Sequence, residues 1–247
     1  MKKSIKNSKK KILLLIGNVL GMSVLKFLKR IKYLEIQTYT SDKSLIKSKN
    51  IKYVKTKKTF IKILKRECVY DFLIIVYWPW MVPKNLFEKF RNSINFHPAF
   101  LPYGRGWYPH VHAIIKKIKW GVTLHKIFPG MDNGDIWCQK EIKLSKFAKS
   151  TDLYSKAKLE ILKLFKKNFK KILNGKIIAK KQKGKVLKFH KTDLLKYDKL
   201  FLNKKYKLID LIRINNARTF KDKTFNFFID NSDKYEFKIT VKKLSNI

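Results

Sequence analysis

The middle of the chain provides three side chains that could transfer a one-carbon acyl group to an amine: Asn95, His97 and Asp132. Attack of an amine on a formyl carbonyl needs a base for the proton of the nucleophile and a donor for the oxyanion of the tetrahedral intermediate. The imidazole of His97 can be the base, and the side-chain amide of Asn95 can be the donor. The carboxylate of Asp132 can orient the imidazole and raise its basicity.

The spacing of these residues favours a common site. Asn95 and His97 are two positions apart, so on an extended strand their side chains leave the same face. Asp132 lies between Gly130 and Gly134, which allow a tight turn and a close approach to a ligand. Asn, His and Asp are also common loop residues, so the segment 130–135 could be a simple turn. The combination at strand ends favours the functional interpretation.

The first half of the chain alternates strand and helix patterns. A continuous apolar run such as 72–77 is typical of a strand that is buried on both faces. The alternation predicts an α/β fold with an open, mostly parallel, Rossmann-like sheet, in which ligands bind beyond the carboxyl ends of the strands. The expected strands are 11–16, 36–40, 72–77 and 93–96; a turn is expected at 17–21, and helices at 22–32, 59–66 and 84–90.

The second half of the chain predicts further helices and strands and then a small C-terminal unit. The expected elements are a helix at 108–117, strands at 121–127 and 136–142, and a long helix from Ser150 or Thr151 to about Leu173. After a polar connection at 180–188 we expect a helix at 208–213 and a β-hairpin from 224 to 241. We therefore predict a catalytic domain over residues 1–180 and a C-terminal extension over residues 181–247.

The composition is that of a folded, strongly basic protein. The 247 residues are 45% hydrophobic and 14% aromatic, which is enough for a core despite a formal net charge of +42. Most of the charge is Lys, whereas proteins that recognise phosphate specifically favour Arg. We interpret the charge as a solvated surface that also attracts anionic substrates. The alternative is a non-catalytic, Lys-rich nucleic-acid-binding protein on an α/β scaffold.

The cysteines and the start of the chain predict a cytoplasmic location. Cys68 and Cys138 are far apart and lack metal-ligand spacing, which is typical of reduced thiols. The basic start and the apolar run 12–25 resemble a signal peptide, but polar and glycine residues interrupt the run and no cleavage site follows. The run is also too short to span a membrane.

The central segment resembles the folate-dependent formyltransferases, which act on methionyl-tRNA, on glycinamide ribonucleotide or on nucleotide-linked amino sugars. Their pattern N-x-H-x-S-x-L-P corresponds to residues 95–102, with Ala99 at the position of the usual Ser, a change that we expect to affect hydrogen bonding and not the chemistry. A weaker resemblance covers residues 11–175. The further matches are Arg105-Gly106, Pro109, Ala113-Ile114, Gly121-Val122-Thr123 and Asp132-Asn133-Gly134-Asp135.

The resemblance implies a donor, a catalytic set and a folate site. The donor would be 10-formyltetrahydrofolate, no metal would be needed, and Asn95, His97 and Asp132 would be the catalytic residues. The folate would bind beyond the strand ends, at Trp78, Pro79, Trp80, Met81, Val82, Gly130, Asp132 and Asp135.

A polar and aromatic segment after the first motif is the candidate acceptor site. An aromatic ring there could stack on a base or a hexose, and Arg105 could bind a phosphate. The alternative is that Trp107 and Tyr108 are packing residues and that His110 lies on a helix surface. We interpret His125, inside a strand, as a structural histidine. The candidate acceptor-binding residues are Tyr103, Arg105, Trp107, Tyr108 and His110.

The C-terminal part of the chain helps to decide which of the family's three acceptors this protein uses. The transfer-RNA enzymes carry a larger C-terminal barrel, and the glycinamide ribonucleotide enzymes leave the C-terminal unit unexplained. The sugar enzymes share the core and carry short additions of strands and hairpins, which the segments 191–193 and 208–213 resemble. We expect a nucleotide-linked amino sugar, dTDP-4-amino-4,6-dideoxyglucose, and a product used for O antigen (lipopolysaccharide) or another surface polysaccharide. The hairpin is expected to form either a homodimer contact or a cap on the sheet.

Overall fold

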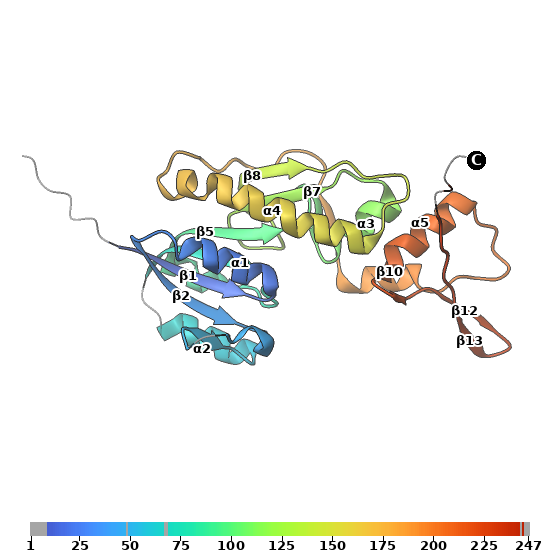
Figure 1. Ribbon diagram of the computed structural model, residues 1–247, viewed down its shortest axis with the longest axis horizontal. Helices are drawn as coiled ribbons and strands as arrows, with labels where there is room; N and C mark the ends of the chain where they lie inside the picture. The colour runs from blue at the N-terminus through green and yellow to red at the C-terminus, as the bar shows by residue number, and fades with distance from the viewer. Residues whose placement is uncertain (1–8, 48, 67–68, 243, 245–247) are drawn as a thin grey trace, which may run out of the picture. The chain divides into compact units, whose positions relative to one another are not determined.

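The computed structural model describes residues 9–47, 49–66, 69–242 and 244, and it contains a central sheet of seven strands (Figure 1). Their order in the sheet is β3-β2-β1-β4-β5-β7-β8. The four pairs from β3 to β5 are parallel, which confirms the predicted α/β fold with a mostly parallel sheet. The strands are β1 (Lys10–Ile16), β2 (Leu34–Thr40), β3 (Ile51–Tyr53), β4 (Tyr70–Val76), β5 (Phe90–His97), β7 (Gly121–His125) and β8 (Ile136–Glu141).

The helices follow the predicted order with shifted ends. They are α1 (Val19–Leu28), α2 (Lys57–Arg66), α3 (Pro109–Lys116), α4 (Ser150–Leu173) and α5 (Leu208–Arg218), with 3-10 turns η1 (Lys43–Leu45), η2 (Lys84–Lys89) and η3 (Lys191–Tyr197). The first helix begins earlier than predicted because the Asn18 side chain accepts a hydrogen bond from the Leu20 amide and caps it. Gly21 therefore lies in a helix and not in a turn. A Cβ on Gly21 would lie 2.4 Å from the Ile16 side chain, so α1 packs directly on β1.

The chain divides into two compact units, which are described separately. Unit 1 comprises residues 1–97, 124–138 and 161–182, and unit 2 comprises residues 98–123, 139–160 and 183–247. The expected boundary between residues 180 and 181 stays a prediction. Of the two cysteines, Cys138 is free, and burial raises the pKa of its thiol to about 12; Cys68 lies outside the described residues.

The core of unit 1 fixes the direction of the side chains on β5. Phe165 and Phe169, from the second half of α4, are fully buried and contact Phe27 and Phe72 at ring-centroid distances of 5.7 to 6.4 Å. Phe96 joins them, with its ring 4.9 Å from that of Phe165. Because successive side chains of a strand point to opposite faces, the residues on either side of Phe96 point away from α4. Those residues are Asn95 and His97.

Among its described residues, unit 2 contains four short strands that the sequence did not predict and the hairpin that it did. The strand β6 (Tyr103–Gly106) pairs in parallel with β9 (Leu187–Phe189), which begins within the end of the expected polar connection. Beyond α5 lie β10 (Thr219–Phe220) and β11 (Lys223–Thr224), then the hairpin of β12 (Phe227–Asp230) and β13 (Asp233–Glu236). Its two turn residues, Asn231 and Ser232, have φ values of 44° and 75°, as the tight turns of hairpins require. Among the described residues, no helix is long and apolar enough to cross a membrane.

Candidate active site

Unit 1 brings Asn95, His97 and Asp132 together. Asn95 and His97 lie on β5, and Asp132 lies in the loop that follows β7. The Nδ1 atom of His97 is 3.5 Å from Oδ2 of Asp132, and the Nδ2 atom of Asn95 is 3.4 Å from Oδ1 of the same carboxylate. The side chains of His97 and Asp132 are only 6% and 16% exposed, so an interaction between them is little screened by water.

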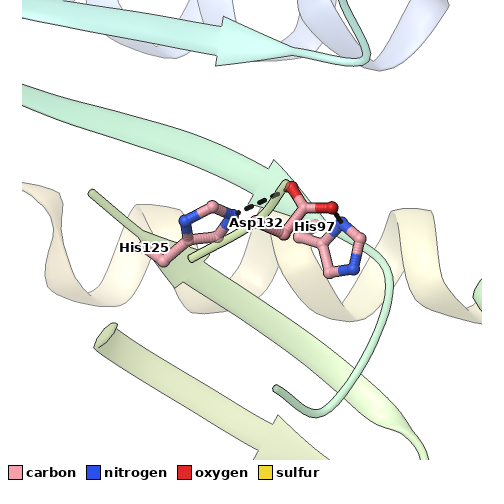
Figure 2. A group of neighbouring side chains, drawn as sticks. All are labelled: His97, His125 and Asp132. Atoms are coloured by element: carbon pink, nitrogen blue, oxygen red, sulfur yellow. Dashed lines mark ion pairs between the residues drawn. The ribbon is translucent and has the colours of Figure 1, made fainter. Parts of the chain in front are cut away.

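His125 completes the cluster, and its role was missed from the sequence. Its Nδ1 is 2.6 Å from the backbone carbonyl oxygen of Lys126, so this nitrogen carries a hydrogen and donates it. In the neutral ring Nε2 is then an acceptor, and it lies 3.0 Å from Nδ2 of Asn95. Figure 2 shows the Asp132 carboxylate between the two imidazoles, with one oxygen toward each. The interpretation of His125 as a structural histidine stays a prediction, and these contacts add it to the cluster.

The contacts of His125 determine which way the Asn95 amide faces. A reversed amide would place its oxygen against the lone pair of His125 Nε2 and against the Asp132 carboxylate. The NH2 group therefore points toward both partners. Its bond to His125 has ordinary length, whereas the 3.4 Å contact with Asp132 is long and weak. The amide hydrogen that faces Asp132 can therefore form a hydrogen bond with a different acceptor at a small cost in free energy.

The loop that carries Asp132 has a strained backbone, and hydrogen bonds from the segment after α4 hold it in place. Asp132 itself has a φ of 47°, and a Cβ on Gly134 would lie 1.7 Å from the Lys126 carbonyl oxygen, so only glycine fits there. Gln182 donates through Nε2 to the carbonyl oxygens of both Asp132 and Gly134, at 2.8 Å each. Two backbone hydrogen bonds between Ile136 and Lys180 fasten the same segment. The segment after α4 therefore sets the position of Asp132.

The cluster could also hold a metal ion. One nitrogen from each of His97 and His125 and one oxygen of Asp132 lie within 4.8 Å of one another, and nitrogen and carboxylate ligands of this kind suit zinc. A metal ion bound through His97 Nδ1 would leave the hydrogen of the neutral ring on Nε2, so His97 could not act as a base. A metal ion and a general base are thus competing uses of this site.

The residues predicted to bind folate form two groups in unit 1. Trp78 and Trp80 lie edge to face, with ring centroids 5.2 Å apart, and both contact Phe60 of α2. Trp78 Nε1 is buried and lacks a hydrogen-bond partner among the described residues, so it can donate to a bound ring. Met81 is 63% exposed and Val82 is buried. Pro79 belongs to the same segment, and the second group is Gly130, Asp132 and Asp135 in the loop after β7.

The residues predicted to bind the acceptor lie in unit 2. Tyr103 and Arg105 are on β6, and the exposed Trp107 and Tyr108 precede α3 with ring centroids 5.9 Å apart. Trp107 is 43% exposed and Tyr108 36%, so each ring is covered in part and open in part, and both the binding and the packing interpretation stay predictions. His110 is only 7% exposed, so the alternative that it lies on a helix surface is wrong.

A comparison with protein families identifies the chain. The profile of the formyl transferase family matches residues 37–167, more than half of the sequence. This chain is a member of the formyltransferase family. The prediction of a formyl-transferring enzyme is thereby confirmed. The matched segment contains Asn95, His97, His125 and Asp132, whereas Gln182 and the C-terminal hairpin lie beyond it.

The relatives of this formyltransferase include enzymes named for sugar substrates. The dTDP-4-amino-4,6-dideoxyglucose formyltransferase of Mycobacterium tuberculosis is 29% identical over 168 residues, which cover 68% of this chain and 71% of the relative. A crystal structure of a 4-N formyltransferase from Francisella tularensis aligns with 96% of this chain and 99% of its own, with a TM-score of 0.83 and 27% identity. The formyltransferase PseJ from Anoxybacillus kamchatkensis, in complex with UDP-4,6-dideoxy-4-formamido-L-AltNAc and tetrahydrofolate, aligns over 76% of this chain and 89% of its own, with a TM-score of 0.59 and 26% identity.

Proposed function

We propose that this formyltransferase transfers the formyl group of 10-formyltetrahydrofolate to the amine of a nucleotide-linked amino sugar, dTDP-4-amino-4,6-dideoxyglucose. The similarity to the 4-N formyltransferase of Francisella tularensis carries this proposal, because it extends over 96% of this chain and includes the C-terminal unit. The named substrate of the Mycobacterium tuberculosis relative supports the choice of sugar. The tetrahydrofolate bound to the similar PseJ supports the choice of donor.

In this proposal His97 moves the proton. Bound 10-formyltetrahydrofolate supplies the formyl carbon that the sugar amine attacks. His97 has Nδ1 directed at Asp132, so Nε2 accepts the proton of the attacking amine and returns it to the departing nitrogen. The negative charge of Asp132 stabilises the imidazolium that forms between these two transfers. The low exposure of both side chains strengthens that interaction.

Asn95 is the proposed oxyanion donor. One hydrogen of its amide stays with Nε2 of His125, and the other leaves the long contact with Asp132 for the developing oxyanion. Such a donor lowers the barrier only if it is held in place before the reaction, which is the part played by His125. Removal of a donor of this kind typically reduces kcat about 100- to 1000-fold.

The reaction class that consumes the product follows from its chemistry. A sugar linked to a nucleoside diphosphate is an activated glycosyl donor, so the next step is a glycosyl transfer. We propose O antigen or another surface polysaccharide as the destination. The cytoplasmic location and the role of the C-terminal hairpin, as a homodimer contact or as a cap on the sheet, stay predictions.

A formyl-transfer assay tests the proposed function. Incubation with 10-formyltetrahydrofolate and dTDP-4-amino-4,6-dideoxyglucose should increase the mass of the sugar nucleotide by one formyl group. His97→Asn should abolish turnover, and the matched control His190→Asn, at an exposed helix cap that Asn also suits, should not. Bound folate without product would exclude this sugar, and absence of folate binding would contradict the whole proposal.

A further inference from the structure

The cluster of His97, His125 and Asp132 has the composition of a metal site. Two imidazole nitrogens and one carboxylate form the protein ligands of several zinc enzymes, whereas magnesium and calcium prefer oxygen ligands. Among the described residues, this is the one group of three such side chains whose ligand atoms come within 4.8 Å of one another. All three residues belong to unit 1, so the arrangement is independent of unit 2.

The distances within the cluster suit a small four-coordinate ion. His97 Nδ1 and His125 Nε2 each lie 3.5 Å from the Asp132 oxygen that they face. Ligand atoms that are about 2.0 to 2.2 Å from a tetrahedral zinc ion lie roughly 3.3 to 3.6 Å from one another. Figure 2 shows the carboxylate between the two rings, with one oxygen toward each. Small rotations of the side chains would therefore bring all three ligands to one ion.

The backbone prepares His125 to be a ligand. Its Nδ1 donates to the Lys126 carbonyl oxygen at 2.6 Å, which leaves the lone pair of the neutral ring on Nε2. Metal-bound histidines nearly always donate their second ring nitrogen in this way, because the bond fixes the tautomer and raises the basicity of the ligand nitrogen. The side chain is only 3% exposed, so little water competes for Nε2. His125 thus has the tautomer and the outer contact of a metal ligand.

The orientation of Asn95 determines whether an ion can bind. Its NH2 group faces His125 Nε2 at 3.0 Å and Asp132 Oδ1 at 3.4 Å, and a metal ion must contact these same ligands. The hydrogens of an amide carry partial positive charge, so the NH2 group must turn away when a cation binds. A reversed amide would present its oxygen, which can serve as a further ligand. The orientation that donates to an oxyanion and the binding of a metal ion therefore exclude each other.

We propose that the cluster is an inhibitory site for a divalent transition metal ion such as zinc. His97 binds the ion through Nδ1, as the tautomer with its hydrogen on Nε2, so it cannot accept the proton of the attacking amine. Asn95 loses the orientation that makes it an oxyanion donor. The inhibition rests on the roles of His97 and Asn95 in the proposed function, whereas the binding of the ion does not.

Calorimetric titration of the full chain with zinc chloride, without folate or sugar, tests the binding. We expect one ion per chain, and the visible absorption of cobalt(II) in place of zinc reports its coordination. His97→Asn and His125→Gln should each weaken zinc binding at least about tenfold, since even the loss of an outer partner of a ligand has an effect of this size. His190→Asn is the matched control, because His190 is exposed and lies outside the cluster. It should bind zinc as the wild type does.

Asn95→Asp keeps the size of the side chain and tests the geometry in the opposite direction. A carboxylate at this position supplies a fourth, negatively charged ligand and has no hydrogen to donate to His125. Zinc affinity should therefore rise at least about tenfold. An ion bound on the surface or by His110 and His112 would not respond to this change. An unchanged or weaker zinc affinity in Asn95→Asp would overturn the assignment, even if His97→Asn and His125→Gln failed to fold.

The formyl-transfer assay tests the inhibition. The concentration of free zinc that halves kcat should equal the dissociation constant from calorimetry, because only the metal-free fraction of the enzyme has its base and its oxyanion donor. A chelator should restore the rate, and magnesium should have no effect, since it prefers oxygen ligands. Zinc that binds at the cluster without slowing formyl transfer would contradict the inhibitory role.

The outcomes also separate this proposal from the proposed function. If the metal-free enzyme formylates the sugar nucleotide and zinc binding is unaffected in His97→Asn and His125→Gln, the function stands and the metal site is wrong. If zinc binds more weakly in these two variants and more tightly in Asn95→Asp, while the metal-free enzyme formylates no amino sugar, the metal site stands and the proposed acceptor is wrong.

Discussion

At the scale of single residues, the cluster depends on side chains that hold others in place. His125 directs the Asn95 amide, and Gln182 holds the backbone of the Asp132 loop through two 2.8 Å hydrogen bonds. Asp132 has a left-handed backbone, so without external contacts the loop would relax toward more favourable dihedral angles. Gln182 supplies such contacts from a distant part of the sequence. It is a positioning residue for the proposed reaction.

Replacement of Gln182 should therefore slow the reaction without preventing binding. Gln182→Leu keeps most of the side-chain volume but leaves two carbonyl oxygens without their donor. We expect kcat to fall about tenfold, which corresponds to a loss of about 1.4 kcal/mol in the transition state, while the KM of each substrate changes little. Steady-state kinetics, in which the concentrations of both substrates are varied, separates the effect on kcat from the effect on each KM.

The control for Gln182 is a second amide that also donates to the backbone. Gln139 donates to the carbonyl oxygen of Leu101, and both residues belong to unit 2, so Gln139→Leu removes a comparable bond that does not involve the Asp132 loop. It should leave kcat close to that of the wild type. Equal losses of kcat in the two variants, or a change confined to KM in Gln182→Leu, would remove the positioning role.

The part of the site that could be predicted from the sequence was the part that local patterns encode. Asn95 and His97 are two apart on a strand, and Asp132 lies between glycines, so residue type and spacing were sufficient. Gln182 was not predictable, because it lies in a Lys-rich segment without periodicity and acts through contacts with backbone 48 and 50 residues away. His125 was visible as a residue, but its role depends on β7 lying beside β5.

At the scale of the elements, the buried strands were the easiest to predict and the short segments of unit 2 the hardest. Long apolar runs such as β1 and β4 have one physical explanation, burial on both faces. The strand β9 has three residues and gains its stability from pairing with β6, a tertiary contact that its own sequence does not encode. The helix α3 shows a further limit of pattern reading, since it buries two histidines, His110 and His112.

These two histidines should make the stability of the protein depend on pH. Burial is the main cause that lowers the pKa of each ring to about 4, from an ordinary value near 6.5. The unfolded chain therefore binds more protons than the folded chain between these values, and stability falls as the pH falls from about 6.5 to about 4. Each histidine contributes a slope of up to about 1.4 kcal/mol per pH unit, and thermal unfolding at a series of pH values measures the sum.

A variant of His112 tests whether the buried histidines cause the loss of stability at low pH. Its ring stacks on Phe189 at a centroid distance of 3.8 Å, and neither nitrogen has a hydrogen-bond partner among the described residues. Burial is the largest cause of the lowered pKa of His112; among the nearby charges Asp193 raises this pKa, and Lys116, Lys196 and Arg218 lower it. His112→Phe should raise the thermal midpoint near pH 5 and reduce the pH slope. An unchanged slope would show that other groups cause the acid sensitivity.

At the scale of the whole molecule, the dominant property is the formal net charge of +42. The six arginines include Arg213 and Arg218, both of which are paired with aspartates, so most of the unpaired positive charge belongs to lysines. A field of this sign raises the local concentration of anionic substrates around the enzyme without fixing their orientation. The folate and the sugar nucleotide of the proposed reaction are both anionic. The charge should therefore affect encounter with substrates and leave the chemical step unaffected.

The dependence of the kinetics on salt tests that role. An increase from about 50 mM to about 500 mM sodium chloride shortens the screening length roughly threefold. We expect the KM of the sugar nucleotide to rise severalfold and kcat to change less than about twofold, because the pair of His97 and Asp132 is little exposed and is screened much less than the surface lysines. Sucrose at equal osmolality is the control, since it changes water activity without screening charge.

A KM that is independent of salt, together with duplex DNA binding that weakens steeply with salt, would instead favour a surface for nucleic acid. In that case the DNA affinity should be the same in His97→Asn as in the wild type, because the lysines that bind phosphates would act independently of the catalytic cluster.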